Sequence, residues 1–195
     1  MKKIGKILAA NRSEIAIRIF RAAEESGIKT AAIYSKEDRF AIHRFKTDES
    51  YLVGEGKGPI QAYLDIDSII KIAKDAKVDA IHPGYGFLSE SPELAEQCEK
   101  NDITFIGPSK EILKRFGNKT EAKKVAEEAK VGTVPSVLVT KENLKSVEKE
   151  VEKIGYPVIV KASWGGGGRG MRVVRSSNEL IDQITTAQSE SLKAF

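Results

Sequence analysis

Residues 156–174 read Tyr-Pro-Val-Ile-Val-Lys-Ala-Ser-Trp-Gly-Gly-Gly-Gly-Arg-Gly-Met-Arg-Val-Val, and this stretch decides how the rest of the chain is interpreted. Pro157 opens a short apolar run, Val158 to Val160, which has the length of a strand rather than of a helix. A second short apolar run, Met171 to Val174, follows the glycines. The stretch therefore predicts a hairpin of two strands joined by a long tip that has almost no side chains.

The tip, Gly165 to Gly168, has a composition that suits a polyphosphate. Glycine residues adopt positive φ without strain, and they let backbone N–H groups approach an anion closely. Lys161 can bring its ammonium group against a phosphate oxygen. The common nucleotide motifs do not fit, because a P-loop needs G-x-x-x-x-G-K-[ST] before a helix and a dinucleotide fingerprint needs a helix after its glycines. A flexible linker is the alternative, but linkers seldom have apolar strands on both sides.

Residues 1–107 predict a Rossmann-like α/β domain, because short apolar strands alternate with amphipathic helices. The predicted strands are Lys6–Ala10, Thr30–Tyr34, Ser50–Val53, Asp79–His82 and Ile103–Ile106. Three helices are expected to begin after capping residues, which are Ser13, Asp65 and Ser91. Gly27 can close the first helix as a C′ residue. Such an alternation indicates a parallel sheet with right-handed crossovers.

Residues 108–131 predict a helical connector. Ser109 can cap a helix over Lys110–Phe116, Gly117 breaks that helix, and a second helix covers Lys119–Lys130. Taken by itself, Lys119 is most simply a lysine on a helix face.

Residues 132–195 predict a small α/β unit around the glycine hairpin. A strand over Val134–Val139 comes first, and Thr140 can cap a helix over Lys141–Ile154. After the hairpin, Ser176-Ser177-Asn178-Glu179 has the pattern of a capping box at the start of a last helix. The apolar stripe of that helix consists of Leu180, Ile184 and Ala187.

The Rossmann-like order raises the question of a nicotinamide site. The first strand–helix turn, Ala9 to Ser13, has no glycine, so its backbone could not approach a pyrophosphate in the usual way. The turn after the fourth strand, Pro83 to Phe87, does contain glycines, and it lies at the carboxyl end of a strand, where open α/β sheets bind ligands. A tight turn with only a structural role fits the same spacing equally well.

The composition indicates a globular protein and gives little support for binding nucleic acid. The net charge is +4 and the pI about 9.0, but 32 basic residues are interleaved with 28 acidic ones, as on solvated helix faces. No aromatic interleaving or helix-turn-helix pattern accompanies them. One cysteine, Cys98, excludes an intramolecular disulfide and a cysteine-rich metal site. Because we find neither a signal peptide nor a transmembrane stretch, we expect a cytoplasmic protein without membrane partners.

Three motifs in one order resemble those of the biotin carboxylase family, a branch of the ATP-grasp fold. They are Ala10-Asn-Arg-Ser-Glu-Ile-Ala-Ile-Arg18, His82-Pro-Gly-Tyr-Gly-Phe-Leu-Ser-Glu90 and the glycine stretch from Lys161 to Arg172. Ile106-Gly-Pro108 and Gly117-Asn-Lys119 also fall in the expected order. The resemblance covers the whole chain. It implies an N-terminal, or pre-ATP-grasp, domain over residues 1–107, a connector over 108–131, and the lid subdomain of the ATP-binding domain over 132–195.

The resemblance also implies ATP, Mg²⁺ and biotin as the cofactors of a parent enzyme that phosphorylates bicarbonate and carboxylates carrier-linked biotin. The residues that it places near ATP are Lys119, Lys161, Gly166, Gly167 and Gly168 at the phosphates and Met171 by the adenine. It places Tyr85 and Gly86 near the biotin pocket. The Mg²⁺ ligands and the catalytic base would lie in a missing carboxyl-terminal half of the grasp, so no catalytic or metal-binding residue is expected within this chain.

The implied partners are a second copy through the N-terminal domain, a biotin carrier domain and bicarbonate. Residues 48–56 and 62–65 resemble the pyruvate-carboxylating branch of the family more than the acetyl-CoA-carboxylating branch, which implies transfer to pyruvate to give oxaloacetate. One alternative is the biotin carboxylase subunit of an acyl-CoA carboxylase. Another is an inactive module for dimerisation or nucleotide binding.

The sequence departs from the family at two short places. Ser13 stands where many relatives have glycine, and we expect it to cap the first helix equally well. Residues 134–138 lack the Gly-Ser and Gly-Pro turns that are common there, which leaves the path of the first lid strand open.

Overall fold

A five-stranded parallel sheet organises the first half of the computed structural model, which describes residues 3–140, 143–144, 146–161 and 171–194. The strands are β1 (Lys6–Ala9), β2 (Lys29–Tyr34), β3 (Glu49–Leu52), β4 (Ala80–His82) and β5 (Thr104–Phe105). Their order across the sheet is β3-β2-β1-β4-β5, and every neighbouring pair is parallel. The predicted parallel α/β fold is confirmed, and each strand predicted for this sheet agrees with the structure to within a residue at either end.

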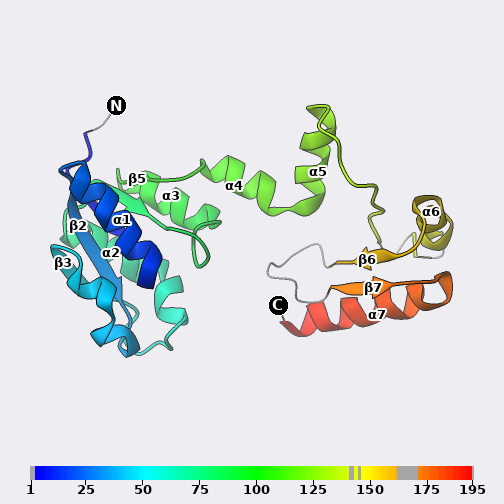
Figure 1. Ribbon diagram of the computed structural model, residues 1–195, viewed down its shortest axis with the longest axis horizontal. Coiled ribbons are helices and arrows are strands. Elements are labelled where there is room, and N and C mark those ends of the chain that lie inside the picture. Colours follow the sequence, from blue (N-terminus) through cyan, green and yellow to red (C-terminus); the bar gives the residue numbers. More distant parts are fainter. Residues whose placement is uncertain (1–2, 141–142, 145, 162–170, 195) are drawn as a thin grey trace. The chain divides into compact units, whose positions relative to one another are not determined.

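Helices cover both faces of this sheet (Figure 1). Helix α1 (Ser13–Glu25) packs on one face, and helices α2 (Ile66–Asp75) and α3 (Pro92–Lys100) pack on the other. Successive side chains of a strand point to opposite faces. Along β1, Ile7 accordingly joins the α1 core, and Leu8 joins the core with α2 and α3. Burial on both faces explains why the central strands β1, β2 and β4 contain uninterrupted apolar runs.

The ends of the helices follow the predicted chemistry except at α1. The side chains of Asp65 and Ser91 cap α2 and α3, and Gly27 adopts a φ of +67° just after α1. The predicted cap at Ser13 is wrong. The N-cap position of α1 is Arg12, whose side chain makes no capping hydrogen bond, and Ser13 itself has a φ of +55°, outside the extended region in which capping side chains work.

Three short 3₁₀ helices lie in the connections on either side of β3. They are η1 (Glu37–Phe40), η2 (Ile42–Phe45) and η3 (Gln61–Leu64). Four residues are too few to give a periodic pattern, so the sequence did not predict them. No helix in the described part of the chain is long and apolar enough to span a membrane.

The chain divides into two compact units, Met1–Lys114 and Arg115–Phe195, and helix α4 (Lys110–Gly117) runs across the division. The predicted cap of α4 is confirmed, because Ser109 Oγ accepts a hydrogen bond from the backbone of Ile112 at 3.4 Å. Helix α5 (Lys119–Glu128) follows directly. The Asn118 side chain caps it by accepting hydrogen bonds from two backbone N–H groups at 2.9 and 3.3 Å.

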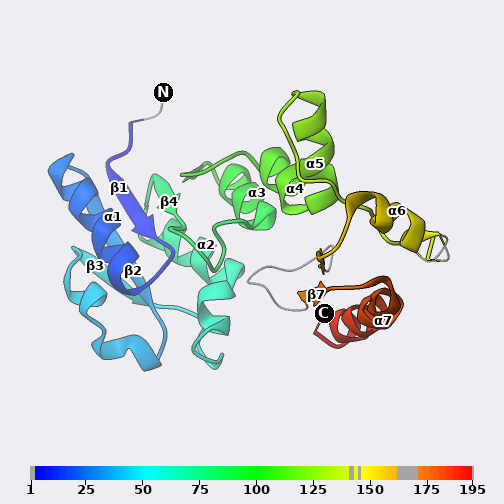
Figure 2. The same cartoon turned by 45° about the vertical axis from the view of Figure 1, so that its right-hand side comes forward.

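An antiparallel hairpin forms the centre of the second unit, as predicted. Strand β6 (Val158–Val160) pairs with β7 (Arg172–Val174), and helices α6 (Val147–Ile154) and α7 (Ser177–Ala194) complete the unit. The hairpin lies along α7 in both views (Figure 2). Its core consists of Val147, Val151, Val174, Leu180 and Ile184. Ala187 is buried as well, so the predicted stripe of the last helix is confirmed.

The start of the second unit differs from the prediction. Residues 131–140 have no regular secondary structure, so the predicted strand over Val134–Val139 is wrong. Val134 is 83% exposed, and Pro135 has no N–H group to give to a neighbouring strand. The helix predicted from Lys141 begins instead at Val147.

Thr140 makes the hydrogen bond expected of a cap, because its Oγ1 accepts from the backbone N–H of Asn143 at 3.4 Å. The Asn143 side chain reciprocates: its Oδ1 accepts from the backbone of Thr140 at 2.8 Å, and its Nδ2 donates to the carbonyl of Leu138 at 2.7 Å. Helix α6 nevertheless begins only at Val147. The box predicted at residues 176–179 is also shifted, because Glu179 accepts a hydrogen bond from the backbone of Arg175 at 3.2 Å.

Candidate functional site

The carboxyl ends of β1 and β4 form the first candidate site. The chain runs from β1 outward to β2 and β3 on one side of the sheet, and then starts again beside β1 with β4 (Figure 2). Open α/β sheets bind ligands outside the carboxyl ends of their strands at such a reversal. We call residues 10–14, which follow β1, and residues 83–90, which follow β4, the switch-point edge.

Asn11 ties the two halves of the switch-point edge together. Its side chain is buried, and its Nδ2 donates hydrogen bonds to the carbonyls of Pro83 at 2.7 Å and of Tyr85 at 2.8 Å. Its Oδ1 accepts a hydrogen bond from the backbone of Arg12 at 2.9 Å. A Cβ atom on Gly84 would lie only 2.9 Å from the same Nδ2, so the close approach requires glycine there.

A second tie joins the side chains of Tyr85 and Glu14. The Tyr85 hydroxyl donates a hydrogen bond to the Glu14 carboxylate. This bond lowers the pKa of the Glu14 carboxyl group and raises the pKa of the Tyr85 hydroxyl. The Tyr85 side chain remains 62% exposed although it is held at its backbone and at its hydroxyl. Gly86 beside it adopts a φ of +65°.

The backbone of the switch-point edge is unusual. Among the described residues, the non-glycine residues with left-handed φ are Ser13, Lys77, Phe87, Asp102 and Lys130. Three of these directly follow the C-caps of helices α2, α3 and α5, where a left-handed residue is the ordinary way to end a helix. The other two, Ser13 and Phe87, lie on the switch-point edge. Strained backbone of this kind concentrates at functional sites.

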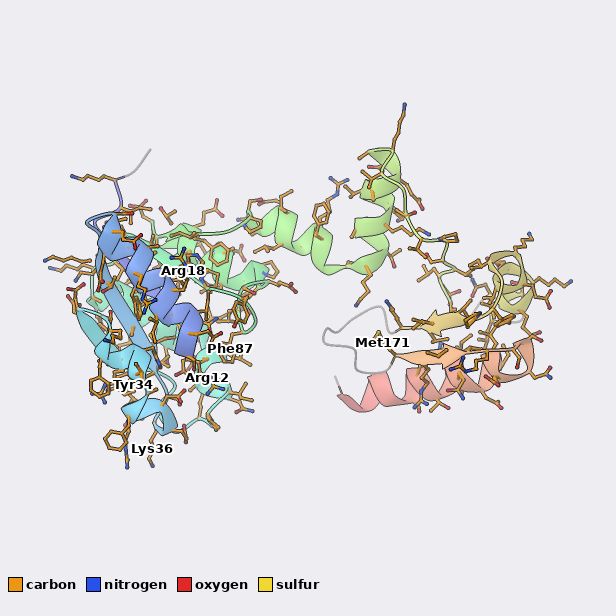
Figure 3. The ribbon with its side chains drawn as sticks, viewed as in Figure 1. Arg12, Arg18, Tyr34, Lys36, Phe87 and Met171 are labelled. Atoms are coloured by element: carbon orange, nitrogen blue, oxygen red, sulfur yellow. The ribbon has the colours of Figure 1, made fainter. Side chains whose placement is uncertain are left out.

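Arg12 lies at the centre of a cluster of aromatic and acidic side chains on the same edge. Its guanidinium is 5.6 Å from the centre of the Tyr63 ring and 5.7 Å from that of Phe87, and these two rings stack at 5.1 Å (Figure 3). It also forms an ion pair of 3.1 Å with Asp38. Tyr63 donates a hydrogen bond of 2.7 Å to the same carboxylate.

Ionisation in this cluster follows from burial and hydrogen bonding. Burial and then the hydrogen bond to Asp38 raise the pKa of Tyr63, so its hydroxyl stays protonated. Burial would raise the pKa of Asp38, but the hydrogen bonds from Tyr63 and Arg12 outweigh it and lower that pKa. The edge therefore holds the Arg12–Asp38 ion pair against two stacked rings. Sequence reasoning gave Arg12 no role, although the residue lies within the first family motif.

The glycine hairpin is the second candidate site. Ile159 of β6 and Val173 of β7 are 54% and 52% exposed, and they are directly paired across the hairpin. Helices α6 and α7 pack against the opposite side, where Val174 is buried. Because side chains alternate along a strand, Lys161 and Met171 extend the exposed face by two positions on each strand. Figure 3 shows Met171 at the end of the hairpin.

The structure places the predicted ATP residues unequally. Lys161 and Met171 are exposed and follow directly from the paired residues Val160 and Arg172, so the hairpin brings them together. Lys119 is the first residue of α5 and is exposed. Gly166, Gly167 and Gly168 lie outside the described residues. Within the described ranges, no three histidine, cysteine, aspartate or glutamate side chains gather as metal ligands would.

Sequence reasoning missed Ile159 and Val173 as candidate ligand contacts. A signal was present, because both strands of the hairpin are apolar on both faces, whereas a hairpin covered on one side only should alternate apolar and polar residues. Exposed apolar residues on one sheet face mark a surface for a ligand or a partner.

Comparison with known proteins matches both units to families. Residues 3–113 match the family described as the N-terminal domain of biotin carboxylase, and residues 118–195 match the ATP-binding domain of the carbamoyl-phosphate synthase L chain. Over its full length the chain is 56% identical to pyruvate carboxylase from Bacillus subtilis and 50% identical to human mitochondrial pyruvate carboxylase. It spans 17% and 16% of the length of those two relatives.

Solved structures of biotin-dependent carboxylases share the fold. Pyruvate carboxylase from Rhizobium etli, solved with the allosteric activator acetyl coenzyme A, aligns with all of the chain at a TM-score of 0.88 and 53% identity, and the chain covers 17% of it. The biotin carboxylase domain dimer of 2-oxoglutarate carboxylase from Hydrogenobacter thermophilus, solved with MgADP, ADP and bicarbonate, aligns at 0.92 and 41% identity, and the chain covers 43% of it.

Proposed function

The chain belongs to the biotin carboxylase family, and from this premise we propose that it is the amino-terminal part of the biotin carboxylase component of a pyruvate carboxylase. The whole protein would use MgATP and bicarbonate to carboxylate carrier-linked biotin, and would then pass the carboxyl group to pyruvate to give oxaloacetate. The observation that carries the proposal is that the entire chain, through both units, aligns with pyruvate carboxylases at half or more identical residues.

In this proposal the hairpin of the second unit binds the nucleotide. The exposed face of Ile159, Val173 and Met171 offers apolar surface for the adenine, and covering it removes that surface from water. Lys161 at the end of the same face and Lys119 at the start of α5 would hold phosphate oxygens. Gly166, Gly167 and Gly168 would add backbone donors.

The chemistry in this proposal is a phosphoryl transfer followed by carboxylation. A bicarbonate oxygen attacks the γ-phosphorus of ATP, and ADP leaves. The resulting carboxyphosphate then transfers its carboxyl group to N1′ of biotin, inorganic phosphate leaves, and the N1′ proton goes to the catalytic base. Lysines that neutralise phosphate oxygens stabilise the charge that develops in such a transfer. Mg²⁺, which the proposed function requires, would supply positive charge to the phosphates, and we propose that its ligands belong to the part of the parent enzyme that follows this chain. The same holds for the catalytic base.

The switch-point edge is the side that would face biotin in this proposal. Its position at the reversal of strand order supports a ligand there independently of any resemblance. Tyr85 presents an exposed ring, and Gly86 has no side chain to obstruct an approaching group. The partners would be a biotin carrier domain, bicarbonate, and a second copy of the protein through the unit that contains this edge.

The test is an assay of the full-length protein with MgATP, bicarbonate and free biotin. We expect ADP release that depends on biotin, and label from ¹⁴C-bicarbonate that appears in oxaloacetate when pyruvate is the acceptor. Lys161→Ala is the matched control for the nucleotide site, and the 195-residue chain alone should release no ADP. If ADP is released at the same rate with and without biotin, the biotin carboxylase assignment is wrong. If the label passes only to an acyl-CoA, pyruvate is not the acceptor.

A further inference from the structure

Tyr85 combines exposure with restraint, and the combination needs an explanation. Its side chain is 62% exposed, so holding it removes little apolar surface from water. Holding it nevertheless costs side-chain entropy. Its backbone carbonyl and its hydroxyl are both hydrogen-bonded, to Asn11 and to Glu14. Restraint that adds little to stability is expected where a binding surface must be formed in advance.

The restraining groups come from one short segment. Asn11 lies in the turn after β1, and Glu14 lies in the first turn of α1. The buried amide of Asn11 fixes the path of the 83–85 backbone, and the Glu14 carboxylate fixes the direction in which the Tyr85 ring points. A third contact, from the backbone N–H of Gly84 to Nδ1 of His82 at 3.0 Å, holds the start of the same loop.

Resting on the proposed function, we propose that Asn11 and Glu14 are positioning residues for biotin. They hold the Tyr85 ring so that the incoming biotin meets a preformed surface rather than a mobile side chain. Neither residue needs to touch biotin or the reacting atoms. Glu14 acts through the Tyr85 hydroxyl, and Asn11 acts through the backbone of the loop.

Glu14 gives the cleaner test, because it is exposed and its replacement leaves no buried group unpaired, unlike the replacement of Asn11. In the full-length enzyme, we expect Glu14→Ala and Tyr85→Phe each to lower kcat/KM for free biotin by roughly three- to tenfold, which is the effect of one hydrogen bond. The double variant should be no worse than either single one, because both changes remove the same bond.

Three further measurements separate positioning from a structural role. Glu14→Gln should restore most of kcat/KM for biotin, because its amide oxygen still accepts the hydroxyl proton. The KM for ATP and the thermal midpoint should be unchanged in Glu14→Ala, Tyr85→Phe, the double variant and Glu14→Gln. The matched control is Glu24→Ala, an exposed glutamate near the other end of α1, which should behave like the unmodified enzyme.

The outcomes distinguish this inference from the proposed function. If the unmodified enzyme releases ADP in response to biotin but Glu14→Ala keeps its full kcat/KM for biotin, positioning by Glu14 is refuted and the function stands. Effects of Glu14→Ala and Tyr85→Phe that add in the double variant would also refute it, since they would then be independent. If ADP release by the unmodified enzyme does not depend on biotin, the proposed function is refuted, and this inference, which rests on it, is refuted as well.

Discussion

The two units of the chain leave their strands covered to different extents. In the unit Met1–Lys114, helices pack on both faces of the sheet, and Leu8 and Ile81 on its central strands are fully buried. In the unit Arg115–Phe195, helices pack on one face of the hairpin, and Ile159 and Val173 on the other face are about half exposed. Both sheets contain apolar strands, but only the central strands of the first are covered on both faces.

The difference separates apolar residues that fold the protein from apolar residues that remain available. Burial of a side chain stabilises the fold in proportion to the apolar area removed from water. The Ile81 side chain is fully buried and contributes all of this stabilisation, whereas the half-exposed Ile159 side chain contributes only part of what its burial could give. The exposed face of the hairpin therefore keeps a capacity to bind that the first sheet lacks. In the first unit, polar groups at the end of the sheet, and not its faces, are left to bind a ligand.

The largest expected effect contrasts these two isoleucines. Ile81→Ala should lower the free energy of unfolding by about 2–5 kcal/mol, because it leaves a cavity between sheet and helices. Ile159→Ala should cost less than about 1 kcal/mol, since much of its side chain already contacts water. Urea denaturation of the 195-residue chain, followed by far-ultraviolet circular dichroism, measures both. Equal losses would mean that the hairpin face is covered in solution.

Lys161 tests the available face of the hairpin directly. Lys161→Ala in the full-length enzyme removes a charge-assisted contact of about 1.5–3 kcal/mol, so we expect kcat/KM for ATP to fall by roughly ten- to a hundredfold. The free energy of unfolding should change little because the side chain is exposed. Lys153→Ala on α6 is the control, as an exposed lysine of the same unit away from the hairpin end. Steady-state kinetics that match those of the control would remove Lys161 from the nucleotide site.

The covered unit was also the easier one to predict from sequence. Its central strands β1, β2 and β4 contain short apolar runs, and they alternate with amphipathic helices, so their positions follow from local pattern alone. The strand predicted over Val134–Val139 was wrong because a run of apolar letters did not show that Val134 would stay exposed or weigh the missing N–H group of Pro135. The cluster around Arg12 could not be predicted, because Asp38, Tyr63 and Phe87 come from separate connections and meet only in three dimensions.

Lowering the pH should destabilise the unit Met1–Lys114 more than the unit Arg115–Phe195. Both histidines of the chain, His43 and His82, lie in the unit Met1–Lys114, and burial lowers the pKa of each below its ordinary value of 6.5. The unfolded chain therefore binds more protons than the native one below that pH, so stability rises with pH and is lost as the pH falls through about 6.5. The Nε2 of His43 donates to the carbonyl of Ile33 at 3.1 Å, and its Nδ1 has no partner among the described residues.

Hydrogen exchange at pH 7.5 and 5.5, corrected for the intrinsic rate at each pH, can follow the two units separately. We expect opening of the sheet to become easier at pH 5.5, with little change in α7 and the hairpin. His43→Gln keeps a donor to the Ile33 carbonyl but cannot be protonated. It should therefore reduce the pH dependence, and an unchanged dependence would assign the effect to other groups.

The smallest effect concerns Ser13, where the sequence was read as a cap and the structure has a left-handed residue. A positive φ costs conformational energy in a residue that has a Cβ atom, and it costs glycine none. Ser13→Gly should therefore raise the free energy of unfolding by about 0.5–1 kcal/mol, less the entropy that glycine adds to the unfolded chain.

Ser13→Ala separates the two interpretations of Ser13, because it keeps the strain and removes the hydroxyl. If the hydroxyl capped α1, alanine would cost about 0.5–2 kcal/mol. Since the N-cap makes no such bond, we expect Ser13→Ala to change the free energy of unfolding very little. If denaturation shows that Ser13→Ala is destabilised and Ser13→Gly is not stabilised, Ser13 is a cap after all.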